Sequence, residues 1–211
     1  MRFSDLTLLV NLFTIIAAII ASVNYKYYKK STEKHFFHLL WYAVITDTIG
    51  IFSVYYLKEN WTIIYLIFII LSFLFYFYWF YQIIKSPMQK KIIIILSTLF
   101  FCLGVYNLIT VSLDNFHPTT FIFGAIINII LSLFFFSQLL GNRYKTKVKY
   151  NLKFWIASGL ILFNVGLVPL MIFSELFNAY DNFRVIILIS LNLILYCCYS
   201  IGFLWSKKEQ N

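Results

Sequence analysis

Apolar positions occur in seven long stretches that are separated by short polar segments. The stretches cover about residues 5–24, 36–57, 61–84, 91–113, 118–141, 153–175 and 183–205. A helix needs about 20 mainly apolar residues to cross a bilayer, and each stretch reaches that length. The β-branched run at 92–95 would suit a strand in water. In lipid a helix is favoured, because it hydrogen-bonds its own backbone N–H and C=O groups. The pattern therefore predicts an all-α fold, a single membrane domain of seven transmembrane helices over residues 1–211.

Basic residues in the polar segments predict how the chain is oriented. Of the 17 lysines and arginines, 14 lie on one side of the predicted bundle: Lys26, Lys29, Lys30, Lys34, Lys85, Lys90, Lys91, Arg143, Lys145, Lys147, Lys149, Lys153, Lys207 and Lys208. Cytoplasmic segments of membrane proteins carry an excess of such residues. We therefore expect a multi-pass protein of the inner (cytoplasmic) membrane, with its N-terminus outside and its C-terminus in the cytoplasm.

Composition agrees with lipid as the solvent. Hydrophobic residues make up 62% of the chain and charged residues 12%, against about 25% charged in an average soluble domain. The net charge of +9 is spread over four predicted cytoplasmic segments, where anionic lipid headgroups rather than nucleic acid would meet it. Lysines follow the first apolar stretch instead of preceding it, which favours a retained helix over a signal peptide. The aromatic residues at 75–81 suggest a belt at the inner membrane interface.

Asp47 is the acidic residue that lies deepest in a predicted span. A carboxylate near the bilayer centre costs about 2.5–3.5 kcal/mol on insertion scales, so it should face the bundle interior. Within the predicted spans, lysine and arginine occur only at the ends, at Lys91, Lys153 and Arg184, and none lies near the centre of a span to neutralise it. Asp47 would then be protonated, hydrogen-bonded to Asn, Thr or Tyr, or paired with a bound ligand. A ligand, cation or proton site and a purely structural acid both fit this pattern.

Asparagines in four further helices complete the candidate ligand site. They are Asn107, Asn128, Asn164 and Asn192. Side-chain amides of this kind also join helices, with hydrogen bonds that average about 0.6 kcal/mol, so a structural role is the alternative. On the cytoplasmic side, Arg143, Lys145, Lys147 and Lys149 form a basic loop that could bind an acidic partner protein or simply contact lipid.

The sequence shows no motif for catalysis, a metal or a cofactor. The cysteines and histidines lack the spacing of a zinc site, and no serine-hydrolase motif is present. The last predicted helix, 183–205, contains no lysine, which excludes a retinal Schiff base. We predict no catalytic residue, metal or cofactor, and the oligomeric state stays open.

Several short motifs resemble a group of small, uncharacterised seven-helix membrane proteins of Bacteroidota-type bacteria. They are Thr46-Asp47, Phe154-Trp155 with Gly159, and the last helix with Asn192, Tyr196 and residues 201–203. The group in turn resembles the membrane modules of some sensor kinases. That resemblance implies a signalling role. With no cytoplasmic domain expected here, the signal would pass to a separate partner.

Three functions follow as hypotheses. The first is a sensory or regulatory protein that binds a ligand beside Asp47 and a cytoplasmic signalling protein at the basic loop. The second is a small proton-coupled transporter or channel, in which Asp47 alternates between protonated and charged states. The third is a lipid-active enzyme, for which no convincing nucleophile is visible.

Overall fold

The computed structural model describes residues 3–53, 62–110, 118–141, 150–173 and 182–209, and every regular element in these ranges is a helix. The long helices are α1 (Phe3–Tyr28), α2 (Phe36–Phe52), α3 (Thr62–Ile83), α4 (Pro87–Thr110), α5 (Thr119–Gly141), α6 (Leu152–Ile172) and α7 (Asn182–Glu209). A short 3-10 helix, η1 (Thr32–His35), precedes α2. Seven of these segments are long and apolar enough to cross a membrane. This confirms the predicted number and type of elements.

The helix ends differ from the predicted spans by a few residues, and the differences have physical causes. The first helix continues to Tyr28 instead of ending near residue 24. Lys26 is tolerated in this last turn because its long apolar stem lets the ammonium group reach polar surroundings. The fourth begins at Pro87 rather than residue 91, because proline is well suited to the first turn of a helix. The predicted end of the second span, 54–57, lies outside the described residues.

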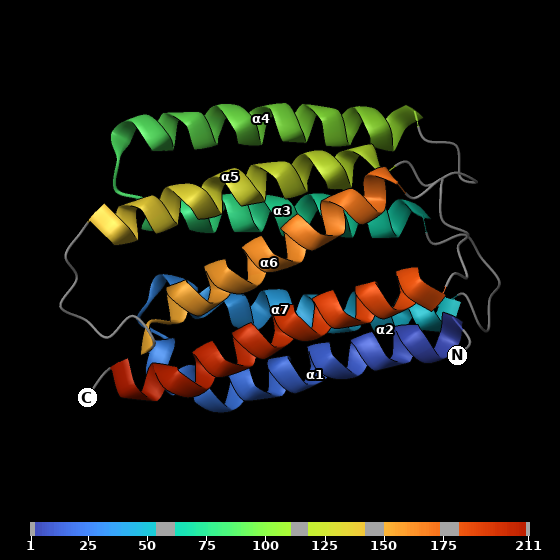
Figure 1. Ribbon diagram of the computed structural model, residues 1–211, viewed down its shortest axis with the longest axis horizontal. Helices are drawn as coiled ribbons and strands as arrows, with labels where there is room; N and C mark the ends of the chain where they lie inside the picture. Colours follow the sequence, from blue (N-terminus) through green and yellow to red (C-terminus); the bar gives the residue numbers. More distant parts are fainter. Residues whose placement is uncertain (1–2, 54–61, 111–117, 142–149, 174–181, 210–211) are drawn as a thin grey trace.

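The helices form a bundle in which α4 lies at one edge (Figure 1). Around the bundle, α1 contacts α2 and α7, α6 contacts α5 and α7, and α3 contacts α2 and α5. The remaining helix, α4, packs against α3 and α5 and is the least buried of the seven spans. The start of α1 and the end of α7 lie at opposite ends of the bundle (Figure 1), as an odd number of crossings requires.

Aromatic side chains fill much of the interior. Phe36 is fully buried, and its ring centroid lies 5.1 Å from that of Phe75 and 5.2 Å from that of Trp79. In α3, Phe77, Trp79 and Phe80 are at most 2% exposed, whereas Tyr78 is 57% exposed. The expected aromatic belt at 75–81 is therefore wrong for Phe77, Trp79 and Phe80, three of its seven residues. These rings pack between helices, because an α-helix turns only part of its circumference towards lipid.

Close helix contacts need small residues at the crossing points. A Cβ atom on Gly124 of α5 would lie 2.8 Å from ring atoms of Phe73 and Phe100, which belong to α3 and α4. At the other end of α5, Gln138 is hydrogen-bonded to the end of α3. Its side-chain oxygen accepts a 2.7 Å hydrogen bond from the backbone N–H of Lys85, which follows α3.

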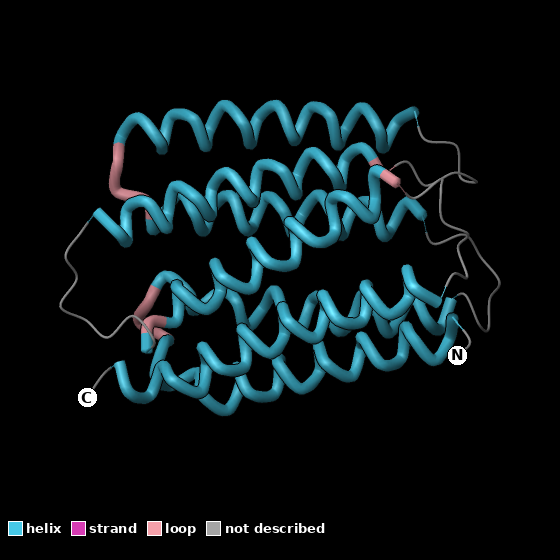
Figure 2. The backbone as a smooth tube through the Cα atoms, in the orientation of Figure 1, coloured by secondary structure: helices cyan, strands magenta, loops and turns pink. Residues whose placement is uncertain are grey.

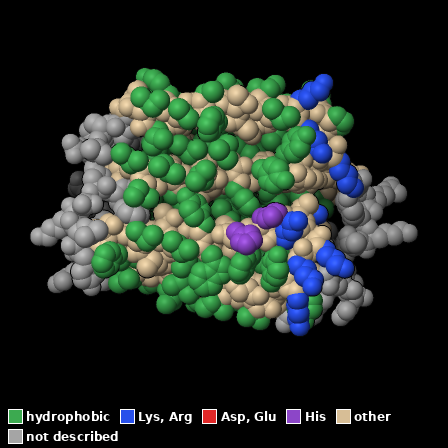
Figure 3. Space-filling view, turned by 180° about the vertical axis from the view of Figure 1, so that it is seen from behind, with side chains coloured by type: hydrophobic (Ala, Val, Ile, Leu, Met, Phe, Trp, Pro, Cys, Tyr) green, Lys and Arg blue, Asp and Glu red, His purple; other side chains and the backbone are tan. Residues whose placement is uncertain are grey.

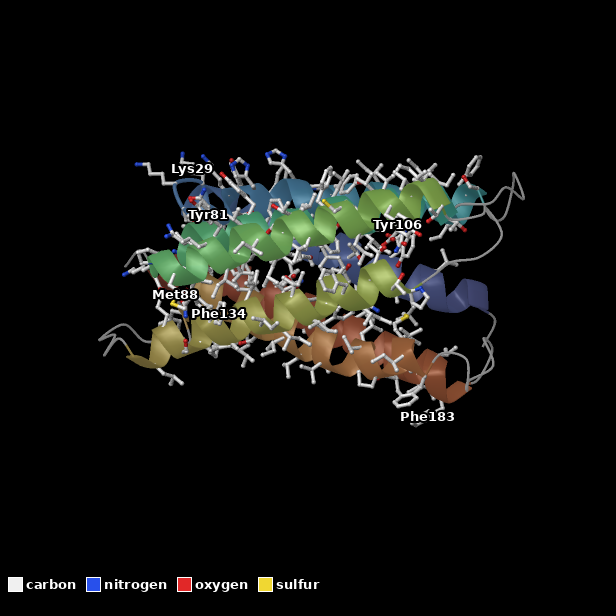
Figure 4. The ribbon with its side chains drawn as sticks, turned by 90° about the horizontal axis from the view of Figure 1, so that it is seen from above. Lys29, Tyr81, Met88, Tyr106, Phe134 and Phe183 are labelled. Atoms are coloured by element: carbon white, nitrogen blue, oxygen red, sulfur yellow. The ribbon has the colours of Figure 1, made fainter. Side chains whose placement is uncertain are left out.

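Described lysines gather at one end of the bundle. Figure 3 shows blue side chains along a single edge of the molecule. In Figure 4, Lys29, Tyr81 and Met88 lie at this end, whereas Tyr106 and Phe183 lie at the opposite one. Described connections before η1, between α3 and α4, and before α6 are at the same end (Figure 2). We call it the basic end.

Candidate functional site

Asp47 lies in the part of α2 that is farther from the basic end, five residues before the helix ends at Phe52. Its side chain is partly buried. The carboxylate interacts electrostatically with the hydroxyl groups of Tyr65 in α3 and Tyr196 in α7. Asp47 therefore faces neighbouring helices, as expected for an acid within a membrane span.

Two tyrosine hydroxyl groups, of α3 and α7, lie near enough for the Asp47 charge to act on them. The Tyr196 hydroxyl lies within hydrogen-bonding reach of the Thr14 side chain of α1. One residue beyond Asp47, Thr48 accepts a 3.3 Å hydrogen bond from the Asn11 amide, also of α1. We call Asp47, Tyr65, Tyr196 and Thr14 the Asp47 cluster. Four helices, α1, α2, α3 and α7, contribute one residue each.

Within the described part of the chain, no hydrogen bond and no neighbouring cation acts on the Asp47 carboxylate. None of these described residues donates a hydrogen bond that would tie Asp47 to a second helix. Removing an ionised group from water without such compensation is unfavourable. A proton or an added cationic group would remove the penalty.

The candidate asparagines do not join this cluster. Asn107 of α4 donates hydrogen bonds of 3.0 Å and 2.6 Å to the hydroxyls of Thr119 and Thr120, which lie in the first turn of α5. Asn192 of α7 donates a 2.8 Å bond to the carbonyl oxygen of Leu188, in its own helix. Both amides therefore have partners that explain them structurally.

Asn128 of α5 and Asn164 of α6 are each only 1% exposed. Asn164 donates to the carbonyl oxygen of Leu160 at 2.7 Å, whereas its own amide oxygen has no hydrogen-bond partner. Neither polar atom of the Asn128 amide has one. The hydroxyl of Ser132, one turn along α5, is also buried without a partner. These buried polar groups belong to α5 and α6, which contribute no residue to the Asp47 cluster.

The predicted partner-binding residues Arg143, Lys145, Lys147 and Lys149 lie outside the described residues. Lys153, which follows them in the sequence, is described at the start of α6. Among the described residues, no three His, Cys, Asp or Glu side chains lie close enough together to hold a metal ion.

The sequence analysis missed Glu33. This residue of η1 is 2% exposed, although its neighbours Ser31, Thr32 and Lys34 suggest an ordinary polar turn. Its Oε1 atom accepts a 3.1 Å hydrogen bond from the Trp79 indole nitrogen of α3 and another from the Thr32 hydroxyl. The partner is 46 residues away in sequence, so only the fold reveals it.

No protein-family model, curated protein or solved structure matches the chain. The resemblance to small membrane proteins and sensor-kinase modules therefore stays a prediction, and function has to be argued from these residues.

Proposed function

We propose that the chain is a sensory or regulatory protein of the cytoplasmic membrane, with the Asp47 cluster as the site of a ligand that carries a cationic group. The observation that carries the proposal is the unpaired carboxylate of Asp47, which faces Tyr65 and Tyr196 without a basic partner among the described residues. An ammonium group offers both the missing charge and donors for the carboxylate and the tyrosine oxygens.

Binding at this site has a route to the rest of the bundle. The cluster takes one residue from each of α1, α2, α3 and α7, so a ligand that draws the carboxylate towards Tyr65 or Tyr196 moves α2 relative to α3 or α7. A ligand shifts such an equilibrium by the difference in its affinity for the two arrangements. The ends of α1 and α7 lie at the basic end (Figure 1), where a signalling partner would respond to the movement.

The orientation forms part of the proposal. The described lysines gather at the basic end (Figure 3), and such an excess favours the cytoplasmic side. The N-terminus would then be outside, the C-terminus in the cytoplasm, and the Asp47 cluster nearer to the outer surface. The loop with Arg143, Lys145, Lys147 and Lys149 would be cytoplasmic and would bind an acidic surface of a signalling partner.

Ligand binding is tested on the purified full chain by thermal unfolding with a panel of amines: ethylamine, putrescine, spermidine and choline. We expect at least one amine to raise the melting temperature of the wild type and to leave Asp47→Asn unchanged. Thr98→Val is the matched control, because the Thr98 hydroxyl is exposed and bonds its own helix at Ile94. Equal shifts in wild type and Asp47→Asn, or no shift with any amine, would contradict the proposal.

The partner is tested separately. Replacing Lys145, Lys147 and Lys149 by glutamine should abolish co-purification of a cytoplasmic protein that the wild type retains. Replacement of Lys26, Lys29 and Lys30, which belong to the same end but to another segment, should leave it bound. If both triple variants lose the protein equally, general charge attraction explains the contact.

A proton-coupled transporter is the second candidate, and the hydroxyl groups near Asp47 favour it. Tyr196 links Asp47 to Thr14, and the Tyr199 hydroxyl donates a 3.4 Å bond to that of Tyr76 closer to the basic end. In proteoliposomes with an internal pH dye, this function predicts proton uptake that Asp47→Asn abolishes. Proton-tight vesicles with wild-type protein, tested with and without the amines that bind, would exclude it.

A further inference from the structure

Glu33, a buried carboxylate that is not part of the Asp47 cluster, lines a pocket at the basic end. The volume of the pocket is about 150 Å³, which is room for about five water molecules at roughly 30 Å³ each. The lining residues are Tyr27, Tyr28, Ser31, Glu33, Leu152, Lys153 and Ser206. They come from the end of α1, the turn into η1, the start of α6 and the last turns of α7.

The position of the pocket along the bundle is that of a membrane interface. The four neighbouring candidate spans end or begin at Tyr28, Thr32, Leu152 and Ser206. Every lining residue is therefore within a few residues of a span end. In a bilayer, this level is occupied by polar headgroups rather than by acyl chains.

Several of the groups that line the pocket are hydrogen-bond acceptors. Both hydrogen bonds to the Glu33 carboxylate from described residues reach Oε1, so Oε2 remains for a ligand. The Ser31 hydroxyl already donates to the carbonyl oxygen of Tyr28 at 2.8 Å, and the Ser206 hydroxyl to that of Phe203 at 2.6 Å. These hydroxyls can therefore only accept a further bond. A primary ammonium group has three N–H donors for such a wall.

The pocket lining also carries a positive charge. Lys153 lines the pocket in the first turn of α6, a helix of 21 residues that is capped by Asn151. The N-terminus of a helix has a partial positive charge and favours anions. Lys153 and Glu33 line the same cavity, yet no salt bridge joins them among the described residues. Two opposite charges that share a pocket without pairing suit a ligand that carries both charges.

We propose that this pocket binds a zwitterion with a primary ammonium group next to an anion, as in the headgroup of phosphatidylethanolamine. The ammonium group binds Glu33 Oε2 and the oxygens of Ser31 and Ser206, and the phosphate binds Lys153. A choline headgroup has the same charges but no N–H donor, so it leaves these acceptors unpaired. The site therefore selects ethanolamine over choline.

The experiment uses native mass spectrometry of the purified full chain with dioleoyl lipids. The headgroups are ethanolamine, N-methylethanolamine, N,N-dimethylethanolamine and choline, each competing at equal concentration. Retention should fall with every added methyl group, to about one tenth at choline, the size of effect expected for hydrogen bonds to charged groups. Equal retention of the four lipids would overturn the proposal.

Variants assign the preference to the pocket. Glu33→Gln should remove it, and Lys153→Gln should weaken binding of all four lipids by about threefold while the order is kept, since it removes one charge contact. Lys30→Gln is the matched control, because Lys30 is exposed and does not line the pocket. If Glu33→Gln does not fold, Ser206→Ala replaces it and should reduce the preference. A folded Glu33→Gln or Ser206→Ala protein with the full preference would overturn the assignment.

The same headgroup chemistry could come from a lipid or from a soluble zwitterion. Soluble glycerophosphoethanolamine is therefore added as a competitor to protein that holds the lipid. Displacement at equal concentration identifies a soluble ligand, and retention of the lipid in a large excess identifies the lipid. Either result supports the proposed recognition of the headgroup by the pocket. If Glu33→Gln protein retains and releases the lipid as the wild type does, the lipid binds elsewhere.

Discussion

The two acidic side chains that the structure describes in detail, Asp47 and Glu33, have opposite surroundings. Glu33 is almost fully buried, yet Trp79 and Thr32 donate hydrogen bonds to it. Asp47 is more exposed and lies near Tyr65 and Tyr196, but no hydrogen bond from a described residue reaches its carboxylate. Burial alone therefore does not mark a functional acid in this bundle. Whether the fold supplies a partner is the better criterion.

The asparagines divide in the same way. Asn107 bonds two threonines of the next helix, whereas both polar atoms of the Asn128 amide are buried without a partner. Removing a bonded polar group leaves its partners unsatisfied, while removing an unbonded one costs little or relieves a penalty. Four substitutions test this difference.

Glu33→Ala should cause the largest change, a loss of about 3 kcal/mol in the free energy of unfolding, because the Trp79 and Thr32 donors both lose their acceptor. Reversible unfolding in mixed micelles measures it. Lys30→Ala, at an exposed position of the same end, should differ little from the wild type. A loss below about 1 kcal/mol would mean that water replaces the carboxylate.

Asn107→Ala should destabilise by about 2 kcal/mol, since two hydrogen bonds of about 1 kcal/mol each are lost between α4 and α5. Asn192→Ala is the control, because its amide donates within α7 to Leu188. The same unfolding assay should show a clearly smaller loss for this variant. If the two variants lose similar free energies of unfolding, the hydrogen bonds from Asn107 to Thr119 and Thr120 add no more stability than a bond within one helix.

Asp47→Asn should raise stability by about 1 kcal/mol, because it removes a charge that no described group compensates. The same variant should lose its response to amines. Gain of stability together with loss of ligand response is the pattern of a functional site. A destabilised variant with an intact response would make Asp47 a structural acid.

Asn128→Leu should have the smallest effect, between zero and a gain of about 0.5 kcal/mol, since the amide has no hydrogen bond to lose and leucine has the same branched arrangement of side-chain heavy atoms. Unfolding of this variant is compared with Asn164→Leu, which loses the bond to Leu160. A loss above about 1 kcal/mol for Asn128→Leu would show that water or a ligand satisfies this amide in the membrane.

The apolar pattern predicted the seven helices because a segment needs about 20 apolar residues to cross the bilayer and must hydrogen-bond its own backbone there. Helix ends were less predictable, as at Tyr28 and Pro87, because lysine stems and proline adapt to the interface. Asp47 was found because its charge is conspicuous in an apolar span. That it faces tyrosines rather than the candidate asparagines depends on how the helices are arranged.

Glu33 could not be recognised from its own segment. Ser31, Thr32 and Lys34 are typical of an exposed turn, whereas Glu33 bonds Trp79 of α3 and lines a pocket with Leu152 of α6 and Ser206 of α7. The only local signal is Ser31, whose hydroxyl accepts a 3.2 Å bond from the backbone N–H of Glu33 and begins η1. Such a cap predicts a turn but not what covers it.

Both sites depend on which end of the bundle faces the cytoplasm, so the most direct measurement is labelling of single cysteines in spheroplasts with a membrane-impermeant maleimide. The background carries serine at Cys102, Cys197 and Cys198. Cysteine at Thr110, an exposed position at the end opposite the lysines, should be labelled in intact spheroplasts. Cysteine at Lys30 should react only after permeabilisation. The reverse pattern would contradict the orientation, and labelling of both positions in intact spheroplasts would contradict the membrane topology itself.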